Sequence, residues 1–449
     1  MHTGQGITRR SLLKAAAVAA PCVIASGALG ADGRPPPSER IGMGFIGLGT
    51  QGGGHLVGGA WTYLTGGYLA REDVQVLGVC DVVRAKRESY KQRVNAYYAE
   101  KSGQGAGGSC EAYNDFRDLL ARTDVDAVVI ASPDHWHVPL SMAAVRAGKD
   151  VFCEKPLAPT VAEGRALADA VRRYGRVFLH GTHQRSFGPF RHACEIALNG
   201  RLGKVHTIRV VERGSWADAV RPPQPVPPEL DYDLWLGQAP EIPYAGQALH
   251  GGMWQCRSDY TAGWISGCGV HPLDIAQWGN GTDRTGPVEV TGRGVYPTNG
   301  FNDTACDWHV EMTYANGVKL IFTSTHNDVN SPEVGARFEG TEGWVMAQGN
   351  ASSILADPPS LLKTVIGPGE IHLAHSDNHA LHFLECVRSR RETVAPAEVA
   401  HRSTTLCLIS DIAMRLGRKL RWDPDKEEFP ADAEANRYLS RAMRAPWRL

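Results

Sequence analysis

The sequence lacks several features that would place it in other classes of protein. Its ten cysteines include no Cys-x-x-Cys pair, so neither a zinc finger nor a dithiol redox centre is predicted. Lys and Arg number 47 and Asp and Glu 48, which indicates no basic surface for nucleic acid or a membrane. No repeat or low-complexity tract is present. The remaining composition, 43% hydrophobic with 50 glycines, is typical of a globular α/β enzyme, and 449 residues favour two domains.

The N-terminal segment predicts export. Arg9 and Arg10 precede a leucine pair, a lysine and a mildly apolar run to about Leu29, which is a poor spanning helix because it contains Pro21. This pattern is typical of a twin-arginine signal, and the alternative is an amphipathic cytosolic tail. We therefore expect a signal peptide over residues 1–30, a linker over 31–40, and a periplasmic or other extracytoplasmic location without membrane contact after cleavage.

A dinucleotide-binding motif follows. The apolar run 41–46 leads into Gly47-Leu48-Gly49-Thr50-Gln51-Gly52, a G-x-G-x-x-G sequence. In this motif the first glycine makes the turn, the second lets the backbone approach a pyrophosphate, and the third lets helix and strand pack closely. The helix that begins here also offers amide N–H groups to the phosphates. We assign Gly47, Gly49, Thr50, Gln51 and Gly52 to cofactor binding.

An acid after the second apolar run indicates which nicotinamide cofactor is used. Residues 74–80 form that run and end in Asp81, whose carboxylate can accept both ribose hydroxyls and repel a 2′-phosphate. The sequence therefore favours NAD, whereas the nearby Arg84 keeps NADP open as the less favoured choice.

Further strands and helices alternate up to residue 183. Apolar strands are expected over 125–131, 150–153 and 177–180, with helices between them, and this alternation predicts a doubly wound parallel sheet over residues 41–183. Ligands of such sheets bind beyond the carboxyl ends of the strands. The residues at those ends are therefore assigned to cofactor binding: Ser132, Pro133, His137, Glu154 and Lys155.

Residues 184–449 are expected to form a second domain. Alternating segments indicate strands over 288–295, 305–314, 318–325, 336–339 and 343–347, with Asn316-Gly317 as a hairpin turn. Amphipathic helices are expected over 379–390 and 400–416. The proline-rich stretch 222–228 and the following residues up to Trp235 are interpreted as an ordered loop over the cleft.

Four motifs together resemble the glucose–fructose oxidoreductase/inositol dehydrogenase (Gfo/Idh/MocA) family: GLGTQG, SPDHWH, Glu154-Lys155-Pro156, and GCGVHPLDIAQWG over 267–279. The resemblance covers roughly residues 40–449. It implies a C-terminal α+β domain with a large, open, mostly antiparallel sheet, a substrate between the domains, and Lys155 beside the nicotinamide. Many relatives oxidise a ring hydroxyl of a sugar or polyol, and their broad sheet often forms homo-oligomers, which we expect here too.

Three residues are candidates for catalysis. An ammonium at Lys155 can hold a reacting hydroxyl and stabilise developing oxyanion character. His271 is a candidate general base, and Pro272 suggests that His271 caps a helix. Asp274 could orient the imidazole or bind a substrate hydroxyl, although it could also only cap. Many family members place an aspartate where this chain has Gly267, which leaves simple dehydrogenase chemistry open to question.

Polar residues near these positions are assigned to substrate binding: His183, Gln184, Arg185, Tyr260 and Asp274. His135 and His137 lack partner residues at ligand spacing, so no metal site is predicted.

Three functions remain open at this point. The first is a NAD-dependent sugar or polyol oxidoreductase. The second is a redox-neutral hydrolase, lyase or epimerase in which bound NAD is reduced and reoxidised within one cycle. Export away from the cytosolic NAD pool favours this function. It would require tightly bound NAD, which we therefore expect. The third is a non-catalytic sugar-binding protein, against which Lys155 and His271 argue.

Overall fold

The computed structural model describes residues 35–59, 62–102, 109–325, 331–349 and 353–449. The expected signal peptide lies outside these residues. Among the described residues, no helix is both long enough and apolar enough to cross a bilayer.

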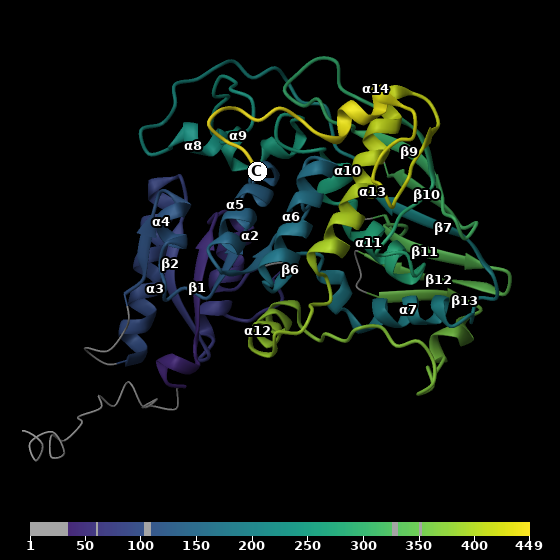
Figure 1. Cartoon of the computed structure of the whole chain (residues 1–449), viewed down its shortest axis with the longest axis horizontal. Coiled ribbons are helices and arrows are strands. Elements are labelled where there is room, and N and C mark those ends of the chain that lie inside the picture. The colour runs from purple at the N-terminus through teal and green to yellow at the C-terminus, as the bar shows by residue number, and fades with distance from the viewer. Residues whose placement is uncertain (1–34, 60–61, 103–108, 326–330, 350–352) are drawn as a thin grey trace, which may run out of the picture.

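The first domain is built on a six-stranded sheet in which every neighbouring pair is parallel (Figure 1). Its spatial order, β3-β2-β1-β4-β5-β6, is that of the dinucleotide-binding fold. The strands are β1 Ile41–Ile46, β2 Val74–Cys80, β3 Glu111–Tyr113, β4 Ala127–Ile130, β5 Asp150–Cys153 and β6 Phe178–His180. The helices are α2 Thr50–Val57, α3 Arg84–Ser102, α4 Phe116–Leu120, α5 Asp134–Arg146 and α6 Val161–Tyr174. The predicted doubly wound sheet is confirmed; β3, only three residues long, was not predicted.

Local sequence explains where these helices begin. The side chain of Asp115 accepts a hydrogen bond from the Arg117 amide, and that of Thr160 accepts one from the Glu163 amide, so both act as N-caps. Helix α5 begins at Asp134, and the polar residues 134–137 form its first turn. That turn is buried against the second domain, so its polarity does not mark a loop.

The second domain contains an eight-stranded sheet in the order β13-β12-β11-β7-β10-β9-β8-β14. All neighbours are antiparallel except β7 and β10. The strands are β7 Val205–Glu212, β8 Glu289–Val295, β9 Asp307–Thr313, β10 Lys319–Ser324, β11 Gly335–Gly340, β12 Gly343–Gln348, β13 Ser353–Asp357 and β14 Leu420–Arg421. The expected mostly antiparallel sheet is confirmed, and Gly317 (φ +84°) forms the predicted turn between β9 and β10.

The helices of the second domain are α7 Gly188–Leu198, α8 Tyr232–Leu236, α9 Gln247–Gly251, α10 Trp264–Gly267, α11 Val270–Gly279, α12 His379–Ser389, α13 Ala397–Leu416 and α14 Ala433–Asn436. Of these, α7, α11 and α13 contact the sheet, and α12 reaches the first domain. Short 3-10 turns are η3 Pro37–Glu39, η4 Tyr68–Ala70, η5 His183–Ser186, η6 Met253–Cys256, η7 Pro359–Lys363 and η8 Arg437–Leu439. Helix α12 places Ala380, Phe383 and Leu384 in the core of the first domain, which makes that core depend on chain far away in sequence.

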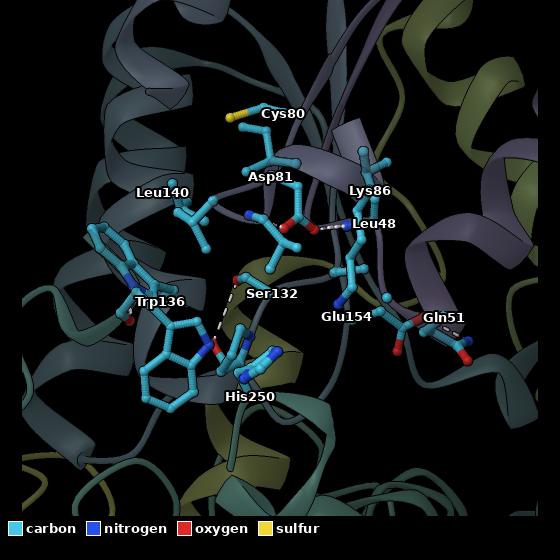
Figure 2. Close-up of a pocket in the computed structure, with 18 of the residues that line it drawn as sticks. Leu48, Gln51, Cys80, Asp81, Lys86, Ser132, Trp136, Leu140, Glu154 and His250 are labelled. Atoms are coloured by element: carbon cyan, nitrogen blue, oxygen red, sulfur yellow. Dashed lines mark hydrogen bonds between the residues drawn. The ribbon is translucent and has the colours of Figure 1, made fainter. Parts of the chain in front are cut away.

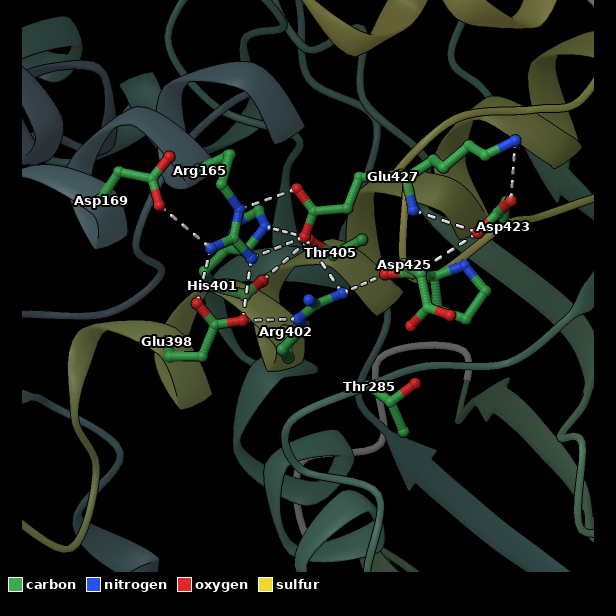
Figure 3. Close-up of polar contacts among 12 residues, drawn as sticks. Arg165, Asp169, Thr285, Glu398, His401, Arg402, Thr405, Asp423, Asp425 and Glu427 are labelled. Atoms are coloured by element: carbon green, nitrogen blue, oxygen red, sulfur yellow. Dashed lines mark hydrogen bonds and ion pairs between the residues drawn. The ribbon is translucent and has the colours of Figure 1, made fainter. Parts of the chain in front are cut away.

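A cluster of charged residues joins the two domains (Figure 3). The Arg165 guanidinium of α6 binds Glu398 at 2.6 and 2.8 Å and Glu427 at 2.7 and 2.9 Å. Arg402 also binds Glu398, at 2.8 Å, and His401 binds Glu427 at 2.7 Å. Because several charges share partners, this network is worth more than an isolated surface ion pair.

A segment of the second domain lies over the first domain; we call residues 230–255 the lid. Leu230 forms a β-bridge with Val83, and the Trp235 carbonyl accepts hydrogen bonds from the Trp136 indole at 2.9 Å and the His135 ring at 3.0 Å. Asp231 accepts one from Asn114 at 2.8 Å. The lid is therefore attached to the first domain at several points.

The last ten residues, 440–449, hold the lid from the other side, and we call them the strap. The Arg444 side chain donates to Asp233 Oδ1 at 2.6 Å and to the carbonyls of Asp233 and Gly237 at 2.9 Å each. Trp447 packs edge-on against Trp136, with ring centroids 4.9 Å apart. The strap thus connects the lid to α5, close to the C-terminal end of the chain as drawn in Figure 1.

Candidate active site

A cleft of about 630 Å³ opens at the carboxyl ends of β1, β2, β4 and β5 (Figure 2). This volume is ordinary for a ligand pocket. The predicted cofactor residues at its wall are Gly47, Gly49, Thr50, Gln51, Asp81, Ser132, Pro133, His137, Glu154 and Lys155. The fold therefore brings together residues that are up to 108 positions apart in sequence.

The glycine motif has the geometry that a pyrophosphate requires. Gly47 adopts φ +85°, and a Cβ there would lie 2.6 Å from the Ala131 carbonyl oxygen. A Cβ on Gly52 would collide with the Gly47 carbonyl, so strand and helix pack closely at that point. A Cβ on Gly49 would meet nothing within 4 Å, which leaves its backbone accessible from the cleft. These are the three separate roles expected of the motif's glycines.

Asp81 lies at the end of β2, directly beside the glycine loop. Its Oδ2 accepts the Leu48 amide at 2.8 Å, as drawn in Figure 2, and its Oδ1 accepts the Val83 amide at 2.8 Å. The carboxylate is thus held in place and retains lone pairs for ribose hydroxyls. Arg84 is exposed and does not line the cleft; the cation that does so on this side is Lys86.

Lys155 lies between the two domains. Its Nζ donates a hydrogen bond to the Gly267 carbonyl oxygen at 2.8 Å, and Gly267 is the last residue of α10. A Cβ at position 267 would meet nothing within 4 Å, so the aspartate found there in many relatives would have room. In this chain the lysine is therefore held by a backbone carbonyl.

His271 lies in the first turn of α11, and the structure corrects the expected cap. The helix begins at Val270 with Gly269 as its N-cap, so Pro272 lies within the first turn. Burial and the positive charge of Lys155 lower the His271 pKa well below its usual value. The His271 Nδ1 atom is buried and has no hydrogen-bond partner among the described residues. The ring is therefore neutral at neutral pH.

Asp274 is not positioned to act on a substrate, contrary to its predicted catalytic and substrate-binding roles. It is buried, and its two oxygens accept hydrogen bonds from Arg185 at 2.7 and 3.0 Å and from the Ser403 hydroxyl at 2.6 Å. Arg185 is equally buried and also binds Asp283 at 3.0 Å. This pair anchors η5 to α11, so the assignment of Arg185 to substrate binding is also corrected.

The other predicted substrate residues also lie off the cleft wall. Tyr260 is fully buried against Trp235 and His135, so its ring belongs to the core of the lid and its assignment is corrected. Gln184 is half-buried beside Gly349. His183 is buried and lies 3.4 Å from a Glu154 oxygen.

Two further groups on the first-domain wall are fixed by contacts. His137 places its ring nitrogens 2.6 Å from the Pro156 carbonyl oxygen and 2.9 Å from that of Ser132, which sets its orientation. Burial raises the pKa of Asp134 to about 6, against the opposing effects of nearby His137 and of the hydrogen bond from Thr261 at 2.6 Å.

Sequence reasoning missed much of the opposite wall, which comes from the lid. Leu234 and Trp235 line the cleft, but they belong to helix α8 and not to a loop, and the proline-rich stretch 222–228 does not line it. The stretch from His250 to Gln255 lines it as well, and Figure 2 shows His250 facing Ser132 across the cleft. The only sequence signals in this stretch are the Gly251-Gly252 pair and Trp254.

Comparison with known proteins agrees with this geometry. The family model of the oxidoreductase NAD-binding Rossmann fold (GFO_IDH_MocA) matches residues 41–182, and that of the C-terminal alpha/beta domain matches residues 213–449. The chain belongs to the GFO/IDH/MocA oxidoreductase family. The resemblance seen in its motifs is thereby confirmed for both domains, and with it a nicotinamide-cofactor fold.

Individual relatives are more distant. Inositol 2-dehydrogenase 2 of Saccharopolyspora erythraea is 31% identical over 192 residues, which are 41% of this chain and 45% of that protein. A glycosyl hydrolase family 109 protein of Shewanella pealeana is 30% identical over 189 residues, 39% of this chain and 37% of that protein. The chain thus spans less than half the length of these two relatives. The structure of aldose-aldose oxidoreductase from Caulobacter crescentus superposes with a TM-score of 0.60 at 20% identity, covering 85% of this chain and 99% of that one.

Proposed function

We propose that the protein oxidises a hydroxyl of a sugar or polyol with NAD, or reduces the corresponding ketone. The observation that carries this proposal is the position of Lys155. It lines the cofactor cleft and at the same time binds Gly267, in the segment that leads to His271. His271 does not itself line the cleft, but the charge of Lys155 acts on its ring, so we propose that a substrate held between the domains contacts both the ammonium and the imidazole.

The chain's own residues supply the proton chemistry. Bound NAD provides the carbon that accepts the hydride. Lys155 donates a hydrogen bond to the substrate oxygen and stabilises the negative charge that develops there. His271, neutral because burial and Lys155 lower its pKa, accepts the hydroxyl proton as the hydride leaves carbon.

The carboxylate of Asp81 supports NAD rather than NADP as the cofactor. Two backbone amides fix it beside the glycine loop, where a 2′-phosphate would lie against its negative charge. Lys86, which lines the same cleft, is the group that could offset this repulsion.

A redox-neutral cycle is the second candidate, and the lid and strap are the observation that favours it. Residues of the lid line the cleft, so a cofactor bound there would lie against them and could be retained between turnovers. A retained nicotinamide would supply hydride acceptance and hydride return within one cycle, while Lys155 and His271 would handle the proton of the sugar hydroxyl before and after elimination or hydrolysis. The relative named as a glycosyl hydrolase family 109 protein is consistent with such chemistry.

One assay tests both candidates. The purified protein is denatured and any released nucleotide is identified; the native protein is then offered sugars, polyols and glycosides while reduced nicotinamide and products are measured. Net NADH formation supports the oxidoreductase, and glycoside turnover without net NADH supports the redox-neutral cycle. Failure to contain or bind a nicotinamide nucleotide would refute both.

Matched variants test the two proposed catalytic groups. Lys155→Ala and His271→Gln should each lower kcat by about 10²–10⁴-fold while nucleotide binding persists, because each removes one proton-handling group. Lys319→Ala, which removes an exposed lysine on β10, is the control and should leave kcat unchanged. Unchanged turnover in Lys155→Ala would remove this residue from the mechanism.

We also propose that the twin-arginine signal exports the protein with its cofactor bound. A lid that encloses the cofactor after folding supports a route that carries folded proteins. Changing Arg9 and Arg10 to lysine should leave the protein in the cytoplasm on cell fractionation. Export of that variant at the normal level would contradict the assignment.

A further inference from the structure

Beneath the cofactor cleft, three potential metal ligands from three different elements converge. His55 belongs to α2, Glu154 follows β5, and His183 begins η5. One ligand atom from each lies within 4.8 Å of the other two. Their side chains are only 0%, 5% and 8% exposed, so bulk water does not fill the space between them.

From this cluster we propose that His55, Glu154 and His183 bind a divalent transition-metal cation. Two imidazoles and one carboxylate form a common protein site for Zn²⁺ and for related ions such as Co²⁺ or Fe²⁺. This proposal does not depend on the reaction that the neighbouring cleft performs.

The size of the cluster fits such an ion. His55 Nε2 lies 2.8 Å and His183 Nε2 3.4 Å from the same Glu154 oxygen, Oε1. Two ligands at about 2.0–2.1 Å from a zinc ion, 90–110° apart, are separated by about 2.9–3.4 Å. Each imidazole is therefore suitably spaced from Glu154 for a shared cation, and the two imidazoles, which lie within 4.8 Å of each other, would have to be no more than about 4 Å apart to bind the same ion.

Both imidazole rings direct Nε2 towards Glu154. His55 Nδ1 and His183 Nδ1 are buried without a hydrogen-bond partner among the described residues, and these atoms would carry the ring protons when Nε2 binds a cation. Gln51 Nε2 lies 3.1 Å from the same Glu154 oxygen, and a turn of this amide would present its oxygen to the cluster (Figure 2). Gln51 and Glu154 both line the cleft beside Lys155, so a cation here would border the cofactor site.

Metal content and spectroscopy test the proposal without any substrate. The purified full chain is stripped with a chelator, dialysed against Zn²⁺ or Co²⁺, and analysed for bound metal and for the visible absorption of coordinated Co²⁺. We expect one equivalent per chain, a Co²⁺ spectrum with nitrogen ligation, and a Tm that rises on adding Zn²⁺.

Near-isosteric variants assign the ligands. His183→Gln and Glu154→Gln should lose the bound equivalent and the Co²⁺ spectrum, while far-UV circular dichroism shows that they remain folded. His309→Ala, at an exposed histidine paired with Glu311 on the second sheet, is the control and should keep both signals. Should one variant fail to fold, the other and His55→Gln decide the result. The proposal is refuted if the wild type binds no stoichiometric metal, or if all three variants still bind the metal. Either result would show that the cluster only holds Glu154 in place by hydrogen bonds.

Discussion

The contacts between the strap and the lid predict how fast a bound cofactor dissociates. Arg444→Ala removes three side-chain hydrogen bonds to the lid, two to Asp233 and one to the Gly237 carbonyl. Since these groups are partly exposed, each bond contributes about 0.5–1 kcal/mol net, or about 2 kcal/mol together. If nucleotide leaves through lid opening, dissociation should accelerate about 30-fold, because 1.4 kcal/mol corresponds to tenfold.

The protein is loaded with radiolabelled nicotinamide nucleotide and mixed with excess unlabelled nucleotide. Rapid filtration then measures the rate at which the bound label is lost. Arg418→Ala is the matched control, since Arg418 forms a comparable paired contact with Asp432 far from the lid. The control should exchange at the wild-type rate. Equal rates in wild type and Arg444→Ala would refute the idea that the lid and strap retain the cofactor.

Three further predictions follow from contacts already described. Asp81→Ser should raise the KM for NAD about tenfold or more and lower the ratio of kcat/KM with NAD to kcat/KM with NADP. Steady-state kinetics with both cofactors measure this ratio, and an unchanged ratio would contradict the role of the carboxylate. Asp274→Ala should lower the free energy of unfolding by about 3–5 kcal/mol, because it leaves the buried Arg185 cation without its main partner. Ser403→Ala removes only a hydroxyl and should lower it by about 1 kcal/mol. Both values are measured by denaturant unfolding. Burial would raise the pKa of Glu427, but hydrogen bonds from His401 and Arg165 lower this pKa to about 2. The ionised carboxylate therefore stabilises the folded protein at any pH above its unfolded pKa of about 4.3. This stabilisation is lost as the pH falls from about 4.3 towards 2. The Tm of wild type should therefore fall more between pH 6 and pH 3 than that of Glu427→Gln, and parallel pH profiles would contradict this.

The sequence predicted the first domain well because its signals are local. Continuous apolar strands and the three glycines require only near neighbours, and Asp81 and Lys155 follow strands whose carboxyl ends must meet at one edge. The positions of these residues around the cleft are therefore a direct result of strand order.

The remainder of the site depends on contacts between distant segments. Arg185 and Asp274 were both assigned to substrate binding, and nothing in either local sequence shows that their charges pair across 89 residues. Likewise His55 and His183 flank Glu154 only after the sheet has formed. Polar residues near a motif can equally well line a cleft or pair in a core, and only the tertiary structure decides between these outcomes.

The contact between Lys155 and Gly267 allows position 267 to be substituted without loss of the hydrogen-bond acceptor of the lysine. Its acceptor is a main-chain carbonyl, which every residue type carries, so the lysine remains ordered whatever side chain occupies position 267. That position is also sterically open. If Lys155 has the catalytic role proposed above, substitutions at position 267 could alter the neighbourhood of the substrate while the main-chain acceptor of the lysine is kept. Libraries aimed at new substrate specificity should therefore begin at residue 267.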